Sequence, residues 1–182
     1  MVVTMAEIEF PDKKYNIIYA DPAWSYGGKL PQRAKKQHYK VMELDDICNL
    51  PVKDIANNNS ILLMWATYPL LAESLRVIKE WGFEYKTCAF TWIKKNKKAD
   101  SFFWGMGMWT RSNAEVCLIG TRGKPKRHSA SVHQVVYEPI REHSRKPDCI
   151  RDKIIELCGD LPRIELFARQ KTPGWDVWGN EV

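Results

Sequence analysis

A short apolar stretch of the sequence ends in an acid, a proline and a tryptophan, which together could hold a planar base. Residues 16–20 have the apolar, β-rich composition of a buried parallel strand. Asp21 follows directly, at the end of a strand where open α/β sheets bind their ligands. Pro22 has no N–H and leaves the strand ladder, so we expect its carbonyl to be free. These acceptors, with the flat faces of Trp24 and Tyr26, suit an aromatic base that carries an amino group.

Apolar strands alternate with amphipathic helices along the rest of the chain. We expect strands over residues 60–66, 85–93, 115–120 and 163–168, and a short one near 134–137. Pro69 should open a helix that runs to Trp81, with Gly82 as its terminating glycine. A further helix should begin at 147–148 and end at Gly159. This alternation predicts a single α/β domain over residues 1–182, with a mostly parallel sheet flanked by helices.

The composition is that of an ordinary soluble globular protein. Hydrophobic residues make up 45% and charged residues 27% of the 182 positions. No apolar run reaches the ~20 residues needed to cross a membrane, and the first residues lack a basic signal-peptide region. We therefore expect a cytoplasmic protein without a membrane partner. Five cysteines without a C-x-x-C pair and four histidines without an H-x-x-x-H pair indicate neither a disulfide framework nor a metal site.

Basic residues give the chain a net charge of +6 and concentrate in expected loops. The two largest groups are Lys94, Lys95, Lys97 and Lys98, and Arg122, Lys124, Lys126 and Arg127. Smaller groups occur within 29–36 and 141–146. Each group could be a solvated loop that keeps the protein soluble. Four such groups, with aromatic residues nearby, favour a surface that follows the phosphates of a nucleic acid.

The connection over residues 101–109 is unusual because it is rich in aromatic residues and glycines. It contains Phe102, Phe103, Trp104 and Trp109, together with two glycines and two methionines. Two interpretations are open. The segment either plugs the core or forms a wall of the active site.

The motif Asp21-Pro22-Ala23-Trp24 resembles the Asp-Pro-Pro-Trp motif of enzymes that methylate the exocyclic nitrogen of adenine. Ala23 replaces the second proline but leaves the acid and the aromatic residue in place. Further segments resemble the same family in the same order, namely 38–42, 62–67, 115–120, 144–148, 163–169 and 178–181. This is the MT-A70 family, which includes eukaryotic mRNA adenosine methyltransferases and bacterial and phage DNA adenine methyltransferases. The compact chain looks most like the DNA members.

The resemblance implies a Rossmann-like, S-adenosylmethionine-dependent methyltransferase fold in which the catalytic motif precedes the cofactor-binding strand. Lys146 has the position of a lysine that reaches the methionine carboxylate, and Arg169 that of an arginine near the ribose. Asn180 and Glu181 stand where the family has an Asn-Gln pair, and Asp21 also borders the cofactor. The family's acidic-aliphatic pair, which holds the cofactor adenine, has no evident counterpart upstream of the catalytic strand.

The implied reaction is direct, in-line methyl transfer to the N6 amine of a flipped-out adenine in DNA, with RNA as the alternative substrate. Asp21 and the Pro22 carbonyl would accept hydrogen bonds from the amine, and no metal is required. Trp24 and Tyr39 are the favoured stacking partners of the base.

Other residues are expected to bind the nucleic acid around the reacting base. Tyr26 is a further stacking candidate, and Glu115 a candidate for the adenine edge or for a strand-edge ion pair with a loop lysine. The two large basic groups would contact phosphates. A homodimer remains open, as does a non-catalytic nucleic-acid-binding subunit of a paired methyltransferase.

Overall fold

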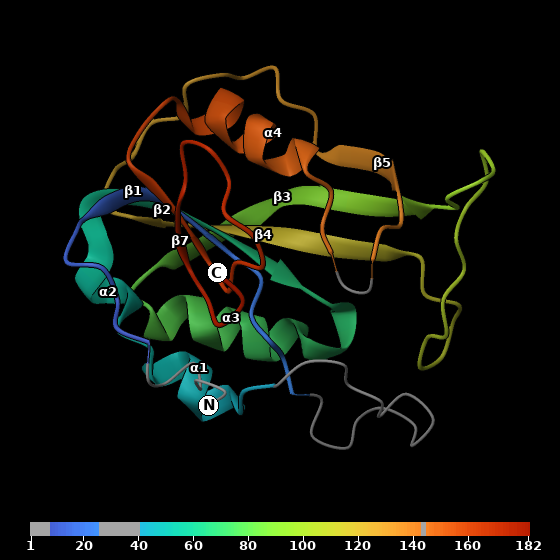
Figure 1. Ribbon diagram of the computed structural model, residues 1–182, viewed down its shortest axis with the longest axis horizontal. Coiled ribbons are helices and arrows are strands. Elements are labelled where there is room, and N and C mark those ends of the chain that lie inside the picture. Colours follow the sequence, from blue (N-terminus) through green and yellow to red (C-terminus); the bar gives the residue numbers. More distant parts are fainter. Residues whose placement is uncertain (1–7, 26–40, 143–144) are drawn as a thin grey trace.

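The computed structural model describes residues 8–25, 41–142 and 145–182, and a seven-stranded sheet lies at the centre of this part (Figure 1). The strand order is β5-β3-β4-β2-β1-β6-β7. The strands are β1 (Tyr15–Ala20), β2 (Ala56–Ala66), β3 (Glu84–Lys95), β4 (Ala114–Arg122), β5 (Val135–Pro139), β6 (Arg163–Leu166) and β7 (Asp176–Trp178). β4 is antiparallel to its neighbours β2 and β3, whereas the other described pairs are parallel. The predicted, mostly parallel α/β sheet is confirmed.

Helices cover both faces of the sheet. They are α1 (Leu44–Asn49), α2 (Val52–Ile55), the 3-10 helix η3 (Tyr68–Leu70), α3 (Leu71–Glu80) and α4 (Cys149–Cys158). Alternation along β1 divides the core: Ile18 packs with α1 and α3, whereas Ile17 packs with α4 on the other face. Figure 1 shows α4 on one side of the sheet and α1 and α3 on the other. No helix in the described ranges is long and apolar enough to span a membrane.

The predicted helix boundaries agree with the structure. The helix expected from Pro69 to Trp81 is η3 followed by α3, and Gly82 ends it with φ +82°. Gly159 ends α4 in the same way, with φ +90°. The strand predicted over 163–168 was two residues too long, because Phe167 adopts φ +61° and β6 ends at Leu166.

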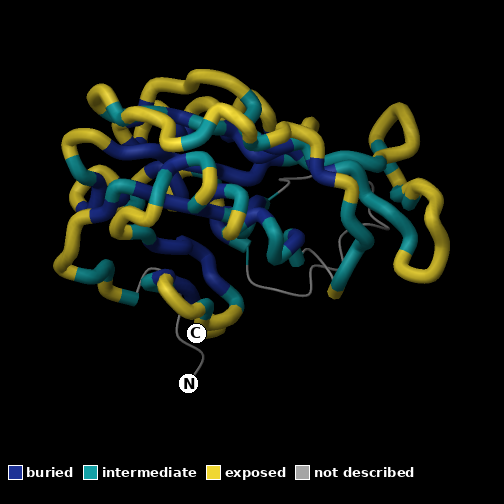
Figure 2. Tube along the Cα trace, turned by 90° about the horizontal axis from the view of Figure 1, so that it is seen from above, coloured by how far each residue is buried: buried dark blue, intermediate teal, exposed yellow. Residues whose placement is uncertain are grey.

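The connection between β3 and β4, residues 96–113, forms an arm that extends the two strands. Isolated antiparallel bridges join Lys95 to Phe102 and Gly105 to Ser112, so the arm folds into two successive hairpins. A Cβ atom at Gly107 would lie 1.7 Å from the Thr110 carbonyl oxygen, so glycine is required at this turn. Figures 1 and 2 show the arm projecting beyond the sheet and largely exposed.

Candidate active site

The sheet topology brings the main functional candidates to one edge. Asp21 directly follows β1. Glu115 lies at the start of β4, and because β4 is antiparallel this start lies beside the carboxyl ends of β2 and β3. We call this end of the strands the active-site edge, since ligands of open α/β sheets bind outside the carboxyl ends of the strands. The other end of the strands is the opposite edge.

A cavity of about 1060 Å³ lies at the active-site edge, a volume at the upper end of those typical for small-molecule sites. Predicted site residues that line it are Asp21, Pro22, Trp24, Lys94, Glu115 and Lys146. The arm supplies another wall through residues 103 and 105–113. The active-site-wall interpretation of the aromatic connection therefore holds for its second half.

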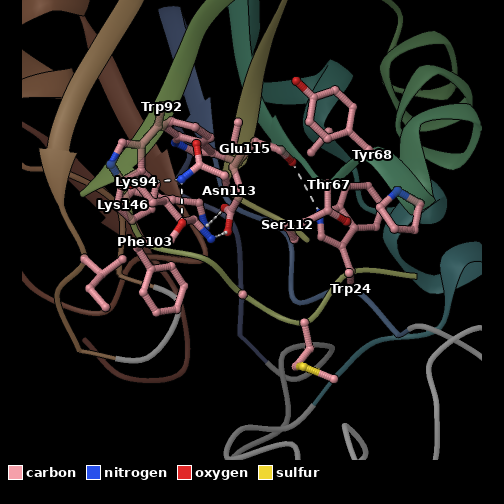
Figure 3. Close-up of a pocket in the computed structure, with 18 of the residues that line it drawn as sticks. Trp24, Thr67, Tyr68, Trp92, Lys94, Phe103, Ser112, Asn113, Glu115 and Lys146 are labelled. Atoms are coloured by element: carbon pink, nitrogen blue, oxygen red, sulfur yellow. Dashed lines mark hydrogen bonds and ion pairs between the residues drawn. The ribbon is translucent and has the colours of Figure 1, made fainter. Parts of the chain in front are cut away.

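Four charged side chains of alternating sign form a network in this cavity. The Lys146 ammonium donates to both carboxylate oxygens of Asp21, at 2.9 and 2.7 Å. Lys146 also lies 3.3 Å from one Glu115 oxygen, and Lys94 lies 2.5 Å from the other. Figure 3 shows Lys94, Lys146 and Glu115 converging on one side of the pocket. A Glu115 ion pair with a loop lysine, one of the two roles considered for it, is therefore present.

The network sets the ionisation of its members. Burial alone would raise the pKa of Glu115, but the charges and hydrogen bonds of Lys146 and Lys94 lower this pKa to about 2. Burial likewise disfavours the charged form of Lys146, yet Asp21 and Glu115 raise its pKa above the ordinary value. The pKa of Asp21 is raised by burial, and Lys146 is the main influence that opposes this rise.

The Asp21-Pro22-Ala23-Trp24 motif differs from expectation in two details. The Pro22 carbonyl is not entirely free, because it accepts a hydrogen bond from the Trp24 backbone N–H at 2.8 Å. A carbonyl oxygen has two lone pairs, so one remains for a ligand. The Trp24 ring borders the cavity but is only 6% exposed, and its indole N–H donates to the Trp65 carbonyl at 3.3 Å.

Tyr68 offers a more exposed aromatic face than Trp24 and was missed in the sequence. It lies just beyond the carboxyl end of β2, lines the cavity and is 56% exposed. Figure 3 shows Tyr68 and Trp24 on the side of the pocket opposite Lys94 and Phe103. The signal for it was its position, since it is an aromatic residue directly after an apolar strand. Tyr26 and Tyr39, the other predicted stacking residues, lie outside the described residues.

The rim of the cavity also carries two arginines. Arg141 and Arg145 line it, and both are held by Asp148, at 2.6 and 3.1 Å respectively. They follow β5 and precede α4, so they lie at the same edge of the sheet. Their sequence signal was the basic group within 141–146.

The predicted cofactor residues Arg169, Asn180 and Glu181 lie beyond the ends of β6 and β7 and do not line this cavity. The Arg169 guanidinium lies 3.6 Å from the Glu181 carboxylate. A Cβ atom on Gly179 would lie 2.4 Å from the Ala168 carbonyl oxygen, so the segments that carry these residues touch.

Arg169 also links the predicted cofactor residues to Asp21, because its charge acts to lower the pKa of Asp21. This donor set fits S-adenosylmethionine, since cations suit its carboxylate and an acid suits its ribose hydroxyls. Among the described residues, no group of three or more acidic, histidine or cysteine side chains is placed to bind a metal ion.

The two large basic groups are separated by the fold. Lys94 and Lys95 are paired with Glu115 and Asp100, whereas Lys97 and Lys98 are exposed on the arm. The second group begins at Arg122, at the opposite end of β4, where Arg122 donates to the Lys53 carbonyl at 2.7 Å. Lys124, Lys126 and Arg127 follow there and are exposed or partly exposed.

The strand order, the acidic motif after β1 and the cavity beside it are those expected of an S-adenosylmethionine-dependent methyltransferase fold. The chain belongs to the MT-A70 family, whose family model matches residues 15–181. The resemblance found in the sequence is thereby confirmed.

Two relatives show the breadth of this family. The type II methyltransferase M.MunI from Mycoplasma sp is 35% identical over an alignment of 194 positions, gaps included. The alignment covers 96% of this chain and 80% of that protein. The human N(6)-adenosine-methyltransferase catalytic subunit METTL3 is 27% identical over 173 residues. That match covers 93% of this chain but 28% of METTL3, so the chain spans little more than a quarter of the human protein.

Proposed function

We propose that this chain transfers a methyl group from S-adenosylmethionine to the N6 amine of adenine in DNA. The observation that carries the proposal is the Asp21 carboxylate, which follows β1, borders the cavity and is held by Lys146 at 2.7 Å. Family membership supports S-adenosylmethionine as the methyl donor. The similarity to a type II methyltransferase over most of both chains favours DNA as the substrate.

The acceptors at the end of β1 suit an adenine amine, which is a poor nucleophile because its lone pair is delocalised into the ring. When bound, S-adenosylmethionine supplies an electrophilic methyl group on its sulfonium. Asp21 and the remaining lone pair of the Pro22 carbonyl accept hydrogen bonds from the two amine N–H groups and draw the nitrogen toward tetrahedral geometry, so that its lone pair is less delocalised and points at the methyl group. Positioning of this kind lowers a barrier by roughly 7–11 kcal/mol.

The charge that develops on the nitrogen during transfer is positive, and the Asp21 carboxylate stabilises it. Asp21 acts as a hydrogen-bond acceptor rather than as a general base, because the methylated ammonium is a strong acid and loses its proton after transfer. Lys146 helps keep Asp21 ionised and fixes both of its oxygens. Trp24, Tyr68 and, outside the described residues, Tyr39 are the aromatic candidates for contact with the flipped base.

RNA adenosine is the second candidate substrate, and the similarity to METTL3 favours it. A non-catalytic subunit is a weaker candidate, because such subunits carry degenerate motifs and this motif retains both Asp21 and Trp24.

The test is transfer of labelled methyl groups to DNA and RNA, single- and double-stranded, followed by nucleoside analysis. We expect N6-methyladenine in DNA, and label in cytosine or in protein alone would overturn the proposal. Asp21→Asn should lower kcat by more than about 1,000-fold, while calorimetry shows cofactor binding within a few-fold of wild type. Asp176→Asn is the matched control, because Asp176 also pairs with a lysine, Lys13, at 2.7 Å but lies at the start of β7.

A further inference from the structure

The turn of the second hairpin of the arm, residues 106–110, exposes large apolar side chains to an unusual degree. We call this turn the tip. Trp109 is 99% exposed and Met106 85% exposed. At the base of the arm, by contrast, Phe102 packs edge-to-face against Trp104 and Tyr137, with ring centroids 5.8 and 5.7 Å apart. An exposed apolar group of this size marks a site of interaction with another molecule.

The arm has a defined geometry that holds these side chains outward. Gly107 makes a turn too tight for any other residue. The Asn113 amide donates to the carbonyls of Lys94 and Phe103, at 3.1 and 2.5 Å, and so ties the end of the arm to its beginning. Arg111 donates to the Trp104 carbonyl at 3.3 Å, across the second hairpin. The exposure of Trp109 is therefore built into the turn.

The position and charge of the tip indicate what it contacts. Met106 and Trp109 border the same cavity as Asp21, so a molecule that fills the cavity reaches the tip. The exposed cations Lys97, Lys98 and Arg111 lie on the arm, and its one acid, Asp100, is paired with Lys95 at 2.7 Å. An apolar tip on a cationic support is complementary to a polyanion with stacked, apolar bases.

We propose that Trp109 is a wedge that enters a DNA duplex beside the target adenine and occupies the space left when that base leaves the stack. This inference rests on the proposed function, because a wedge is needed only if the substrate base leaves a duplex to reach Asp21. Apolar side chains inserted between base steps unstack DNA in this way, and an aromatic ring can stack on the neighbouring bases. Met106 lies close to Trp109 in the sequence of the tip and extends the apolar surface.

The experiment compares two substrates that differ in the need for a wedge. One is a matched duplex with a site that the wild-type protein methylates, identified by sequencing a methylated random-sequence pool. The other has an abasic position opposite the target adenine, which therefore leaves the stack easily. Trp109→Ala should lower kcat/KM on the matched duplex by about 10- to 100-fold, in line with the value of one base stack. On the abasic duplex the defect should shrink to within about threefold.

Three controls accompany this variant. Trp109→Phe keeps an aromatic ring and should retain most of the activity on the matched duplex. Tyr85→Ala removes an aromatic residue that is 44% exposed at the start of β3, far from the arm, and should match wild type on both substrates. With 2-aminopurine as the target base, Trp109→Ala should lose most of the fluorescence increase that wild type produces on binding.

Several results would overturn the wedge. They are an equal loss of activity on both duplexes, no loss on either, or a wild-type protein that methylates single strands but not duplexes. Conversion of a dimer to a monomer by Trp109→Ala, seen by sedimentation, would instead assign the tip to contact with a second copy of the chain. The wild-type assay separates this inference from the proposed function. If wild type methylates no adenine, the proposed function itself fails, whereas an active wild type with an equally active Trp109→Ala refutes the wedge alone.

Discussion

The two ends of the strands, the active-site edge and the opposite edge, carry similar charged pairs in different surroundings. At the active-site edge, the side chains of Lys146 and Asp21 are 9% and 28% exposed. At the opposite edge, Lys13 and Asp176 form a pair of similar length whose side chains are 55% and 44% exposed. The first pair is partly shielded from water and belongs to a network, whereas the second is screened by solvent. The same residue types therefore form a shielded network at one edge and a solvated pair at the other.

The two lysine-rich segments show the same contrast. Residues 94–98 end β3 at the active-site edge, whereas 122–127 follow the end of the antiparallel β4. The β2–β4 register runs from Ala66 opposite Val116 to Ser60 opposite Arg122, six residues or about 20 Å along the strand. Strand direction, rather than composition, decides which basic group lies near the cavity.

Replacing Lys146 should give the largest difference between the edges. Lys146→Met keeps the length of the side chain and removes the charge that opposes the raised pKa of Asp21. The pKa of Asp21 should then rise further, so less of it is ionised at neutral pH. We expect the acid limb of the kcat/KM profile to move to higher pH, with about a 100-fold loss at pH 7.

The control for Lys146→Met is Lys13→Met, which removes the exposed partner of Asp176 and should leave the pH profile unchanged. The pH dependence of the loss of activity distinguishes two roles for Lys146. A deficit that shrinks at high pH supports its action on Asp21. A deficit equal at every pH, with a raised KM for S-adenosylmethionine, would show that Lys146 acts on the cofactor carboxylate instead.

Glu115→Gln should destabilise the fold. The folded pKa of Glu115, about 2, lies below its ordinary value of 4.5. Ionised Glu115 therefore stabilises the protein above about pH 4.5, and this contribution is lost as pH falls toward 2. The pKa difference corresponds to a contribution of about 3 kcal/mol to the free energy of unfolding near neutral pH. Urea unfolding at several pH values should show the wild-type and variant stabilities converging in acid.

The opposite edge supplies the control for Glu115→Gln. Glu84, at the start of β3, pairs with Lys86 at 2.6 Å, but the two side chains are 77% and 43% exposed. Exposed ion pairs contribute little to stability. Glu84→Gln should therefore leave the urea midpoint nearly unchanged, and a decrease as large as that of Glu115→Gln would break the comparison.

Much of this arrangement could be predicted from the sequence. The motif after β1, the helix between Pro69 and Gly82 and the alternation of strands and helices along the chain each have a local signal in residue types that favour one conformation. The cavity follows from them, because parallel strands place their carboxyl ends at one edge.

Other features depend on contacts between distant segments and have no local signal. The reversed direction of β4 determines that Glu115 meets Lys146 and Lys94, and strand direction is set by pairing with β2 and β3. The left-handed conformation of Phe167 is another case, since a bulky residue avoids it and the surrounding packing must impose it. A basic group in the sequence likewise does not reveal which of its lysines are paired with acids.

The smallest expected effect separates the exposed lysines of the two edges. Lys97 and Lys98 lie on the arm near the cavity, whereas Lys124 and Lys126 lie beyond the far end of β4, and all four are exposed. Removing one lysine–phosphate interaction should reduce the slope of log K against log salt by about 0.9. Changing both Lys97 and Lys98 to glutamine should therefore lower the slope by about 1 to 2, measured by anisotropy of a labelled duplex over a salt series. The same change at Lys124 and Lys126 should leave the slope unaltered. Equal reductions from both pairs would mean that DNA contacts both edges, and the functional asymmetry of the sheet would then be confined to its buried charges.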